Sequence, residues 1–119
     1  RVVEIDMRSG KQLRTYVVEG AQFLNDIELA GDLCVAITDM ATGKIHTICK
    51  GDFKAGETAR ITRAAVEGPE LEHPNGIVAL GLGKFLVAGW GPGMKSDFST
   101  DRPGRILEVD LAGKRVSPW

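Results

Sequence analysis

The stretches "FLNDIELAGDLCVAITDM" (Phe23–Met40) and "HPNGIVALGLGKFLVAGW" (His73–Trp90) share one pattern, and this pattern decides the fold. Each begins near a polar pair that contains Asn, continues into an apolar strand, turns at a glycine and returns as a second strand. The two asparagines, Asn25 and Asn75, lie 50 residues apart in the sequence. A period near 50 residues, with strands spaced by about 8–12 residues, is typical of four-stranded β-propeller blades.

Similar hairpins occur at both ends of the chain. The segment "VVEIDMRSGKQL" (Val2–Leu13) resembles "RILEVDLAGKRV" (Arg105–Val116), since both contain an alternating strand, an Asp, a Gly-Lys turn and a second strand. Helical periodicity is absent, and Glu57–Val66, the one stretch where a helix is arguable, suits an edge strand better. We therefore predict an all-β fold, part of a β-propeller built from four-stranded antiparallel blades.

The repeat divides the chain into three parts. Residues 1–20 are expected to form the outer two strands of one blade, residues 21–66 a second blade, and residues 73–119 a third. The strands expected in the second and third blades are Asp26–Ala30, Leu33–Asp39, Lys44–Cys49, Thr58–Ala64, Ile77–Leu80, Phe85–Trp90, Arg105–Asp110 and Arg115–Trp119. Two and a half blades cannot close a ring, so we expect the remaining blades in the same chain or in associated chains. A self-contained β-sandwich is the alternative architecture.

Composition narrows the classes of function. The chain has 119 residues, of which 15 are basic and 16 acidic, so it carries no electrostatic footprint for nucleic acid or a membrane surface. No apolar run approaches the roughly 18 residues that a transmembrane helix needs. The chain opens on Arg1 without an initiator Met or a signal peptide, so we expect a piece of a longer protein whose localisation is unknown.

The two cysteines, Cys34 and Cys49, are too few for a disulfide framework and lack the spacing of a zinc site. They lie opposite each other if the intervening hairpin turns symmetrically, whereas a bulge at Gly43 shifts the register by one residue. Buried free thiols are expected, with a bridge as the alternative.

The polar pairs Asn25-Asp26 and Asn75-Gly76 fall at the start of the first strand of a blade. In a propeller this strand lines the central channel, so both asparagines would face the same axial cavity. An amide oxygen is a hard neutral ligand for Ca²⁺ or Mg²⁺, and the amide NH₂ can donate to a substrate oxygen. The structural alternative is turn chemistry, since Asn tolerates left-handed backbone and caps its own turn.

Together, "FLNDIELAGD" and "HPNGIVAL" resemble the Asn-Asp and Asn-Gly motifs of the six-bladed propellers in the senescence marker protein, gluconolactonase and luciferin-regenerating enzyme superfamily. The resemblance covers essentially the whole chain but only about two and a half of six blades. It implies a divalent metal on the axis, Ca²⁺ before Zn²⁺ or Mg²⁺, and hydrolysis of a lactone or ester. By this resemblance Asn75 supplies a metal-ligating carbonyl, while Asn25 and Asp26 contact the substrate or a water on the metal.

The chain departs from the family pattern in two respects. The family's other ligands are a Glu from an early blade and an Asp from the blade after the second Asn motif, and neither stretch is present. That Asp is also the family's general base, so no catalytic residue is assigned here. Sugar-lactone members carry Arg two residues before the first Asn, where this chain has Phe23, which argues against a sugar acid substrate.

The segment "GWGPGMKSDFSTDRPGR" (Gly89–Arg105) lengthens the middle hairpin of the last blade. We expect an ordered loop that covers the channel mouth and places Trp90, Met94 and Phe98 against the substrate, and a loop that only pads the blade edge is the alternative. His73 is expected to be a solvated loop residue, and His46 a packed or surface residue of its strand.

The leading hypothesis is therefore a piece of a metal-dependent lactonase or esterase that acts on a small molecule and is inactive without the other blades. A non-catalytic propeller that serves as a binding scaffold is an alternative, since a fold does not decide function. A strictosidine-synthase-like propeller is a further alternative with a different reaction class.

Overall fold

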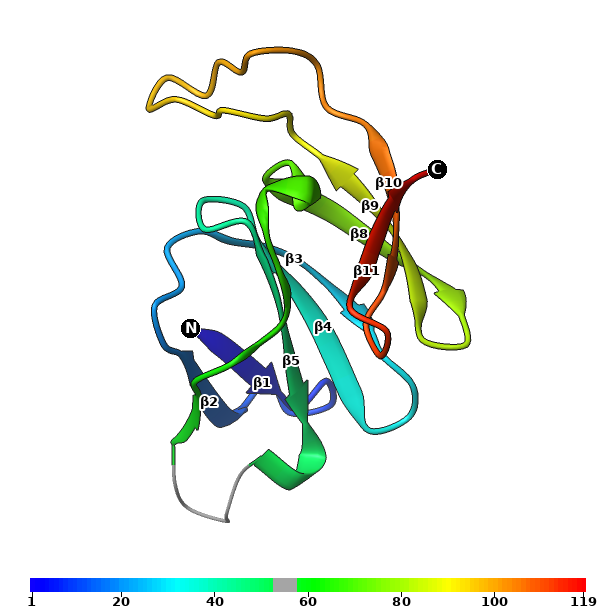
Figure 1. Ribbon diagram of the computed structural model, residues 1–119. Coiled ribbons are helices and arrows are strands. Elements are labelled where there is room, and N and C mark those ends of the chain that lie inside the picture. Colours follow the sequence, from blue (N-terminus) through cyan, green and yellow to red (C-terminus); the bar gives the residue numbers. More distant parts are fainter. Residues whose placement is uncertain (53–57) are drawn as a thin grey trace.

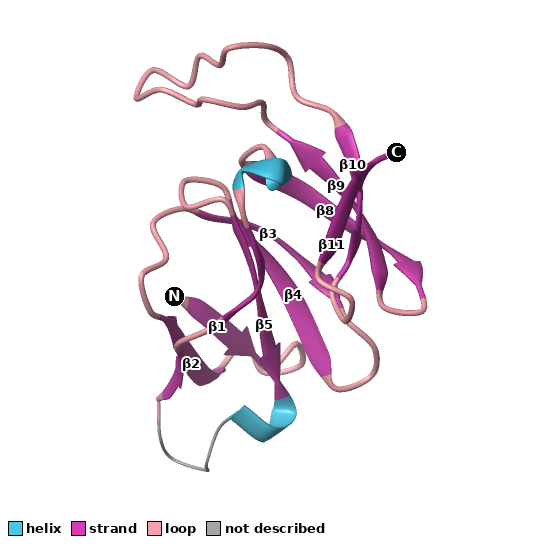
Figure 2. Cartoon of the chain, viewed as in Figure 1, coloured by secondary structure: helices cyan, strands magenta, loops and turns pink. Residues whose placement is uncertain are grey.

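The computed structural model describes residues 1–52 and 58–119. The described chain is built from β-strands, as predicted, and its two helical segments are short 3₁₀ turns, η1 (Lys50–Asp52) and η2 (Pro69–Leu71) (Figure 2). Glu57, the first residue of the arguable helix, lies outside the described residues. Within the described ranges, no helix is long and apolar enough to span a membrane.

The strands form three separate sheets, and none of the three closes on itself (Figure 1). The N-terminal sheet has the order β1-β2-β6, the central sheet β3-β4-β5-β7, and the C-terminal sheet β11-β10-β9-β8. The strands are β1 (Val2–Ile5), β2 (Gln12–Val18), β3 (Leu24–Leu29), β4 (Cys34–Asp39), β5 (Lys44–Cys49), β6 (Ala59–Ile61), β7 (Ala64–Glu67), β8 (Pro74–Gly81), β9 (Lys84–Gly89), β10 (Ile106–Asp110) and β11 (Arg115–Pro118).

The central and C-terminal sheets are four-stranded antiparallel meanders. Seven of the eight strands expected in these sheets are present with bounds shifted by a few residues at most. Strand alternation explains their stability, because every second side chain of a strand faces the neighbouring sheet. In β4, Ala36 packs toward the C-terminal sheet and Ile37 toward the N-terminal sheet.

The prediction of one strand over Thr58–Ala64 is wrong. Ala59–Ile61 pairs in parallel with β2 of the N-terminal sheet, and Ala64–Glu67 completes the central sheet instead. Apolar and polar residues alternate over Thr58–Thr62, so this part of the segment indicates a strand but not which sheet it joins. The chain crosses between sheets inside this run because Ala59 and Ile61 bury themselves against the apolar side chains of β2.

Two apolar clusters hold the three sheets together in chain order. One lies between the N-terminal and central sheets and contains Tyr16, Val18, Ile37, Ile48, Ala59 and Ile61. The other lies between the central and C-terminal sheets and contains Ala36, Ile45, Val66, Leu71, Ile77, Phe85, Val87, Leu107 and Val109. The central sheet therefore has buried side chains on both faces, although Ile27 and Leu29 of β3 remain 50% and 66% exposed.

The outer face of the C-terminal sheet is apolar and open. Val78, Ile106 and Trp119 remain 51%, 47% and 68% exposed on it. They line a shallow hollow of about 470 Å³, with Leu86 and Ala88 behind them. An exposed apolar face of this kind is typical of a surface to which another part of a protein binds.

The hairpin formed by β4 and β5 is closed by a disulfide between Cys34 and Cys49. The register pairs Cys34 with Cys49 and Asp39 with Lys44 without a shift, so the symmetric turn is confirmed and the Gly43 bulge is absent from this pairing. The expectation of free thiols is wrong. Their Cα atoms lie 4.0 Å apart, close enough across a ladder for the two sulfurs to meet.

Candidate functional site

The two polar pairs singled out in the sequence occupy equivalent β-bulges. The β3–β4 ladder loses register between Leu24 and Ile27, which places the bulge at Asn25-Asp26. The β8–β9 ladder loses register between Pro74 and Ile77, which places the bulge at the next Asn pair. In each case two residues of the first strand oppose one of the second. Bulges re-aim side chains and are common beside functional sites.

The two bulges lie side by side, where β3 and β8 run next to each other (Figure 1). The Asp26 Oδ2 atom accepts a hydrogen bond of 2.9 Å from the Ile77 N–H on the other sheet. Thr38, which is fully buried, accepts from the Asp26 N–H at 3.0 Å and donates to the Asn75 carbonyl at 2.6 Å. Side chains of the central sheet therefore fix the second bulge against the first.

The side chains of the two asparagines are available to a ligand. Asn25 is exposed and Asn75 half-buried, and neither amide group makes a hydrogen bond within residues 1–52 and 58–119. Asp26 differs, because its Oδ1 accepts from the Ile27 N–H at 2.9 Å while its Oδ2 is held by Ile77. The structure thus places Asp26 as a link between sheets, and the amides of Asn25 and Asn75 have no partner in the part of the chain that the structure describes.

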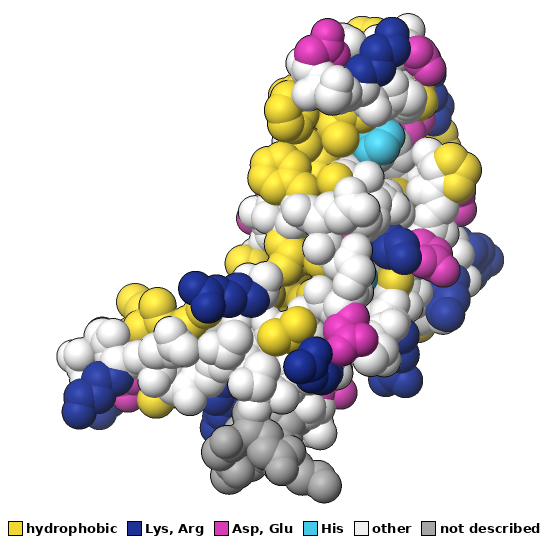
Figure 3. Space-filling model, turned by 90° about the vertical axis from the view of Figure 1, so that its left-hand side faces the viewer, with side chains coloured by type: hydrophobic (Ala, Val, Ile, Leu, Met, Phe, Trp, Pro, Cys, Tyr) yellow, Lys and Arg dark blue, Asp and Glu magenta, His cyan; other side chains and the backbone are white. Residues whose placement is uncertain are grey.

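Three aromatic side chains lie at the same end of the molecule, and we call Phe23, Trp90 and Phe98 the aromatic trio. The rings of Phe23 and Phe98 meet edge-to-face with centroids 6.3 Å apart. The Trp90 Nε1–H donates to the Phe98 carbonyl at 2.9 Å. Hydrophobic side chains gather in the upper part of the face seen in Figure 3, beside a histidine. The sequence predicted the closeness of Trp90 and Phe98 but not the addition of Phe23.

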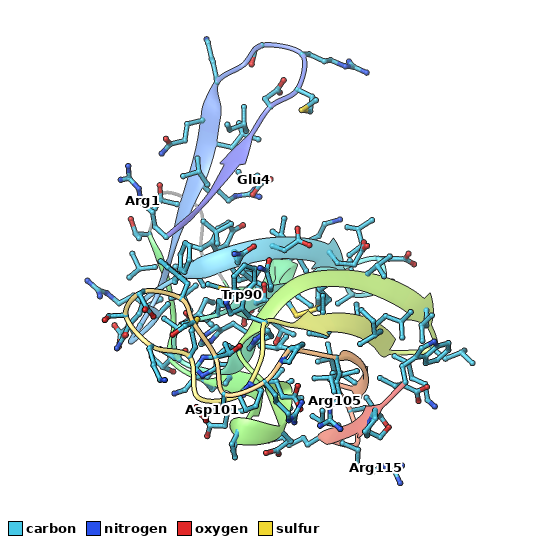
Figure 4. The ribbon with its side chains drawn as sticks, turned by 90° about the horizontal axis from the view of Figure 1, so that it is seen from above. Arg1, Glu4, Trp90, Asp101, Arg105 and Arg115 are labelled. Carbon is cyan, nitrogen blue, oxygen red and sulfur yellow. A yellow bond between two sulfur atoms is a disulfide. The ribbon has the colours of Figure 1, made fainter. Side chains whose placement is uncertain are left out.

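The long loop that follows Trp90 is anchored at its base by Glu72, which is 2% exposed. Its Oε1 accepts from Arg102 Nη2 at 2.6 Å and from Arg105 Nε at 2.9 Å. Burial alone would raise the pKa of the Glu72 carboxyl, but the two guanidinium groups outweigh it and hold this pKa below its usual range. Figure 4 shows the loop between Trp90 and Arg105, with Asp101 on it.

Neither histidine is placed as a ligand. The His73 Nδ1 lies 2.9 Å from the Met40 carbonyl, and its Nε2 accepts from the Met94 N–H at 3.3 Å, so the ring joins the end of β4 to the long loop. This position differs from the solvated loop residue expected for His73. His46 is 3% exposed and packed, as expected, and neither ring nitrogen has a hydrogen-bond partner among the described residues.

A divalent metal fits this site only in part. The Asn75 amide oxygen is a suitable uncommitted ligand, whereas Ca²⁺ takes 6–8 oxygens in proteins. No group of three or more His, Cys, Asp or Glu side chains that could hold a metal occurs in the described part of the chain. The rest of a ligand set would have to come from outside these residues.

Sequence reasoning missed the contacts that position the site. Thr38 and Glu72 act on partners 37, 30 and 33 residues away, and no local pattern indicates such pairs. The one indication in the sequence that Glu72 belongs to the site is that it lies just before the second Asn motif, His73-Pro74-Asn75.

Comparison with known proteins gives little to add to this geometry. No protein-family model matches the chain. No solved structure matches it either. Two curated proteins match over 51 residues, both described as imidazole glycerol phosphate synthase subunit HisH: one from Nostoc punctiforme at 39% identity and one from Trichodesmium erythraeum at 33%. Each match covers 43% of this chain and less than a quarter of the relative, 23% and 22%, so no family follows from them.

Proposed function

We propose that the chain is part of a six-bladed β-propeller that hydrolyses a lactone or ester at its axis with the help of a divalent metal, most suitably Ca²⁺. The observation that carries the proposal is the pair of equivalent bulges. They place Asn25 and Asn75 on the neighbouring strands β3 and β8, and neither amide has a hydrogen-bond partner among the described residues. Bulges kept only for turn chemistry would not need two free amides on adjacent sheets.

The arrangement of the sheets supports the propeller part of the proposal. Propeller blades are antiparallel four-stranded sheets that pack face to face in chain order. The central sheet has buried side chains on both faces, and the outer face of the C-terminal sheet remains apolar and exposed. A following blade would cover Val78, Ile106 and Trp119. Preceding strands would extend β1, the edge of the three-stranded sheet.

The proposed reaction adds one water across an acyl–oxygen bond. A bond forms between the water oxygen and the acyl carbon, the acyl–oxygen bond breaks, and the alcohol oxygen takes up a proton to give a hydroxy acid or an acid and an alcohol. The metal, when bound, would polarise the acyl carbonyl as a Lewis acid. Asn75 would hold the metal through its amide oxygen, and the Asn25 amide would orient the substrate. The general base is not assigned to any residue of this chain.

The test is calorimetric titration of the complete protein with Ca²⁺ and with Zn²⁺. We expect Asn75→Ala to weaken binding of the preferred metal by at least about tenfold, since losing even a group that only hydrogen-bonds to a metal ligand typically costs about 10–100-fold in affinity. Gln22→Ala is the matched control, because it removes an exposed amide from outside the bulges and should leave affinity unchanged. Equal affinity of the Asn75→Ala variant and the parent would remove Asn75 from the site. Absence of any metal binding by the parent would favour the scaffold function.

A further inference from the structure

We propose that the aromatic trio is a ligand subsite that takes an aryl group, so that the substrate class is an aryl-bearing lactone or ester rather than a polyhydroxylated sugar lactone. This inference rests on the proposed function, since it names the substrate of the same site.

The trio is exposed although its side chains are of the kind that is normally covered. Phe23, Trp90 and Phe98 are 41%, 43% and 50% exposed. Since a fully buried aromatic side chain covers about 150–250 Å², the three rings together offer on the order of 300 Å² of apolar surface. Stable protein interfaces bury roughly 800 Å² on each partner, so a small molecule fits this patch better than a protein does.

The rings are held in place before any ligand arrives. The Trp90 indole is bonded to the Phe98 carbonyl, and the Phe98 ring packs against Phe23. The Phe98 backbone has a φ of 64°, an unfavourable left-handed conformation for a bulky residue. A turn in which the Phe98 N–H donates to the Lys95 carbonyl and the Lys95 N–H donates to the Ser99 carbonyl fixes this conformation. Strained backbone that its surroundings enforce is concentrated at ligand sites.

The trio adjoins the two free amides. Phe23 precedes Asn25 by two residues, and Trp90 donates its backbone N–H to the carbonyl of His73, which precedes Asn75 by two residues. Two residues of a strand span about 7 Å. One small molecule can therefore place a carbonyl at the asparagines and an aryl ring on the trio.

The chemistry of the trio selects the ligand. Its one side-chain donor, the Trp90 indole N–H, is already used by Phe98, so the rings offer apolar faces and edges alone. Aromatic pairs bind through offset or edge-to-face contacts, which an aryl group of a ligand extends. A sugar would bring several hydroxyl groups that the trio leaves without partners, and unpaired polar groups oppose binding.

The experiment uses the complete protein with Trp119→Phe, so that Trp90 is the one tryptophan contributed by this segment. Fluorescence is titrated with a γ-phenyl-γ-lactam and with the unsubstituted γ-lactam, two stable carbonyl compounds that differ in the aryl ring alone. We expect the phenyl lactam to change the Trp90 emission and to bind at least about tenfold more tightly. Phe23→Leu, which keeps an apolar side chain but loses the ring, should lower this preference by about three- to tenfold. Leu82→Ala, on a fully exposed turn, is the control and should change nothing.

Equal affinity for the two lactams, or an unchanged preference in Phe23→Leu, would overturn the subsite. Hydrolysis is then measured on γ-phenyl-γ-butyrolactone and on a sugar δ-lactone. Aryl-selective binding without hydrolysis of either lactone keeps the subsite and contradicts the proposed function. Hydrolysis that favours the sugar lactone keeps the hydrolase and contradicts the subsite.

Discussion

Asp39 and Gly89 occupy equivalent positions in the two repeats, yet one is a carboxylate and the other has no side chain. Asp39 pairs with Leu24 just before the first bulge, and Gly89 pairs with Pro74 just before the second. A Cβ at Gly89 would lie 3.0 Å from the Cβ of Glu72, so glycine makes room for the carboxylate of another residue. Both hairpins thus have a buried carboxylate at this end, which comes from β4 in the first repeat and from the segment between η2 and β8 in the second.

The donors that satisfy the two carboxylates differ in kind. Asp39 accepts from the backbone N–H groups of Gln22 and Phe23 at 3.1 and 2.8 Å, and from the Thr42 hydroxyl at 2.6 Å. Glu72 is held instead by Arg102 and Arg105. The backbone donors to Asp39 lie in the segment before β3 and the Thr42 hydroxyl lies in the β4–β5 turn, whereas the donors to Glu72 lie in the long loop. Neutral donors therefore hold the first carboxylate, and cationic side chains hold the second.

The largest effect is expected from Asp39→Ala. The change leaves two backbone N–H groups and a hydroxyl without their acceptor, and unmatched buried donors cost about 1–3 kcal/mol each. We expect the free energy of unfolding, measured in urea, to fall by about 4 kcal/mol. Thr42→Val removes one of the three donors and should cost about 1 kcal/mol. A loss below that of Thr42→Val would contradict the anchoring role of Asp39.

The disulfide closes the other end of the same hairpin, and its loss should be the next largest effect. The two cysteines are separated by 15 residues, and cross-linking a loop of this length stabilises a fold by about 3 kcal/mol. We expect the double variant Cys34→Ser/Cys49→Ser to lose about that amount in urea unfolding. A reducing agent should destabilise the parent similarly and leave the double variant unchanged. If the reducing agent also destabilised the double variant, the destabilisation of the parent would not be due to loss of the disulfide.

Glu72→Gln should cost less than Asp39→Ala, about 2 kcal/mol, because the freed charges can return to water. The side chains of Arg102 and Arg105 are 46% and 47% exposed, so solvent already reaches them. The difference between parent and variant should narrow in high salt, since salt screens partly exposed ion pairs. For Asp39→Ala the corresponding difference should stay constant. If the loss of unfolding free energy in Glu72→Gln did not depend on salt, the ionic nature of this anchor would be contradicted, because salt does not screen neutral hydrogen bonds.

The features that the sequence predicted correctly are those that depend on residues close to one another along the chain. Alternation and the repeat near 50 residues were sufficient for the strands and for the equivalence of Asn25 and Asn75, because both depend on neighbours along the chain. The Cys34–Cys49 register followed from the turn, but register alone does not say whether the thiols are oxidised. The division of Thr58–Ala64 between two sheets depends on partners in other strands, and so do the contacts of Glu72. Such pairings have no signature in the segment itself.

The smallest effect concerns His46, which lies beside Asp39. Its Nε2 is 3.9 Å from the Asp39 carboxylate. Burial lowers the pKa of His46 below its ordinary value of 6.5, although the Arg63 backbone and Asp39 oppose this and Lys44 adds to it. Between the lowered pKa and 6.5, His46 is therefore protonated in the unfolded chain and neutral in the folded chain. Stability from neutral His46 is present above pH 6.5 and is lost as the pH falls through the lowered pKa, by at most about 1.4 kcal/mol per pH unit.

His46→Phe isolates this contribution when urea unfolding is compared between pH 7.5 and 5. We expect the parent to lose stability across this window more steeply than the variant. Below it both proteins should weaken together, because Asp39 and Glu72 have lowered pKa values and stabilise the fold only while ionised. Parallel pH profiles of the two proteins above pH 5 would mean that His46 accepts its proton in the folded state. Asp39 would then have a cationic partner in His46, and the contrast with Glu72 would be smaller than the hydrogen bonds indicate.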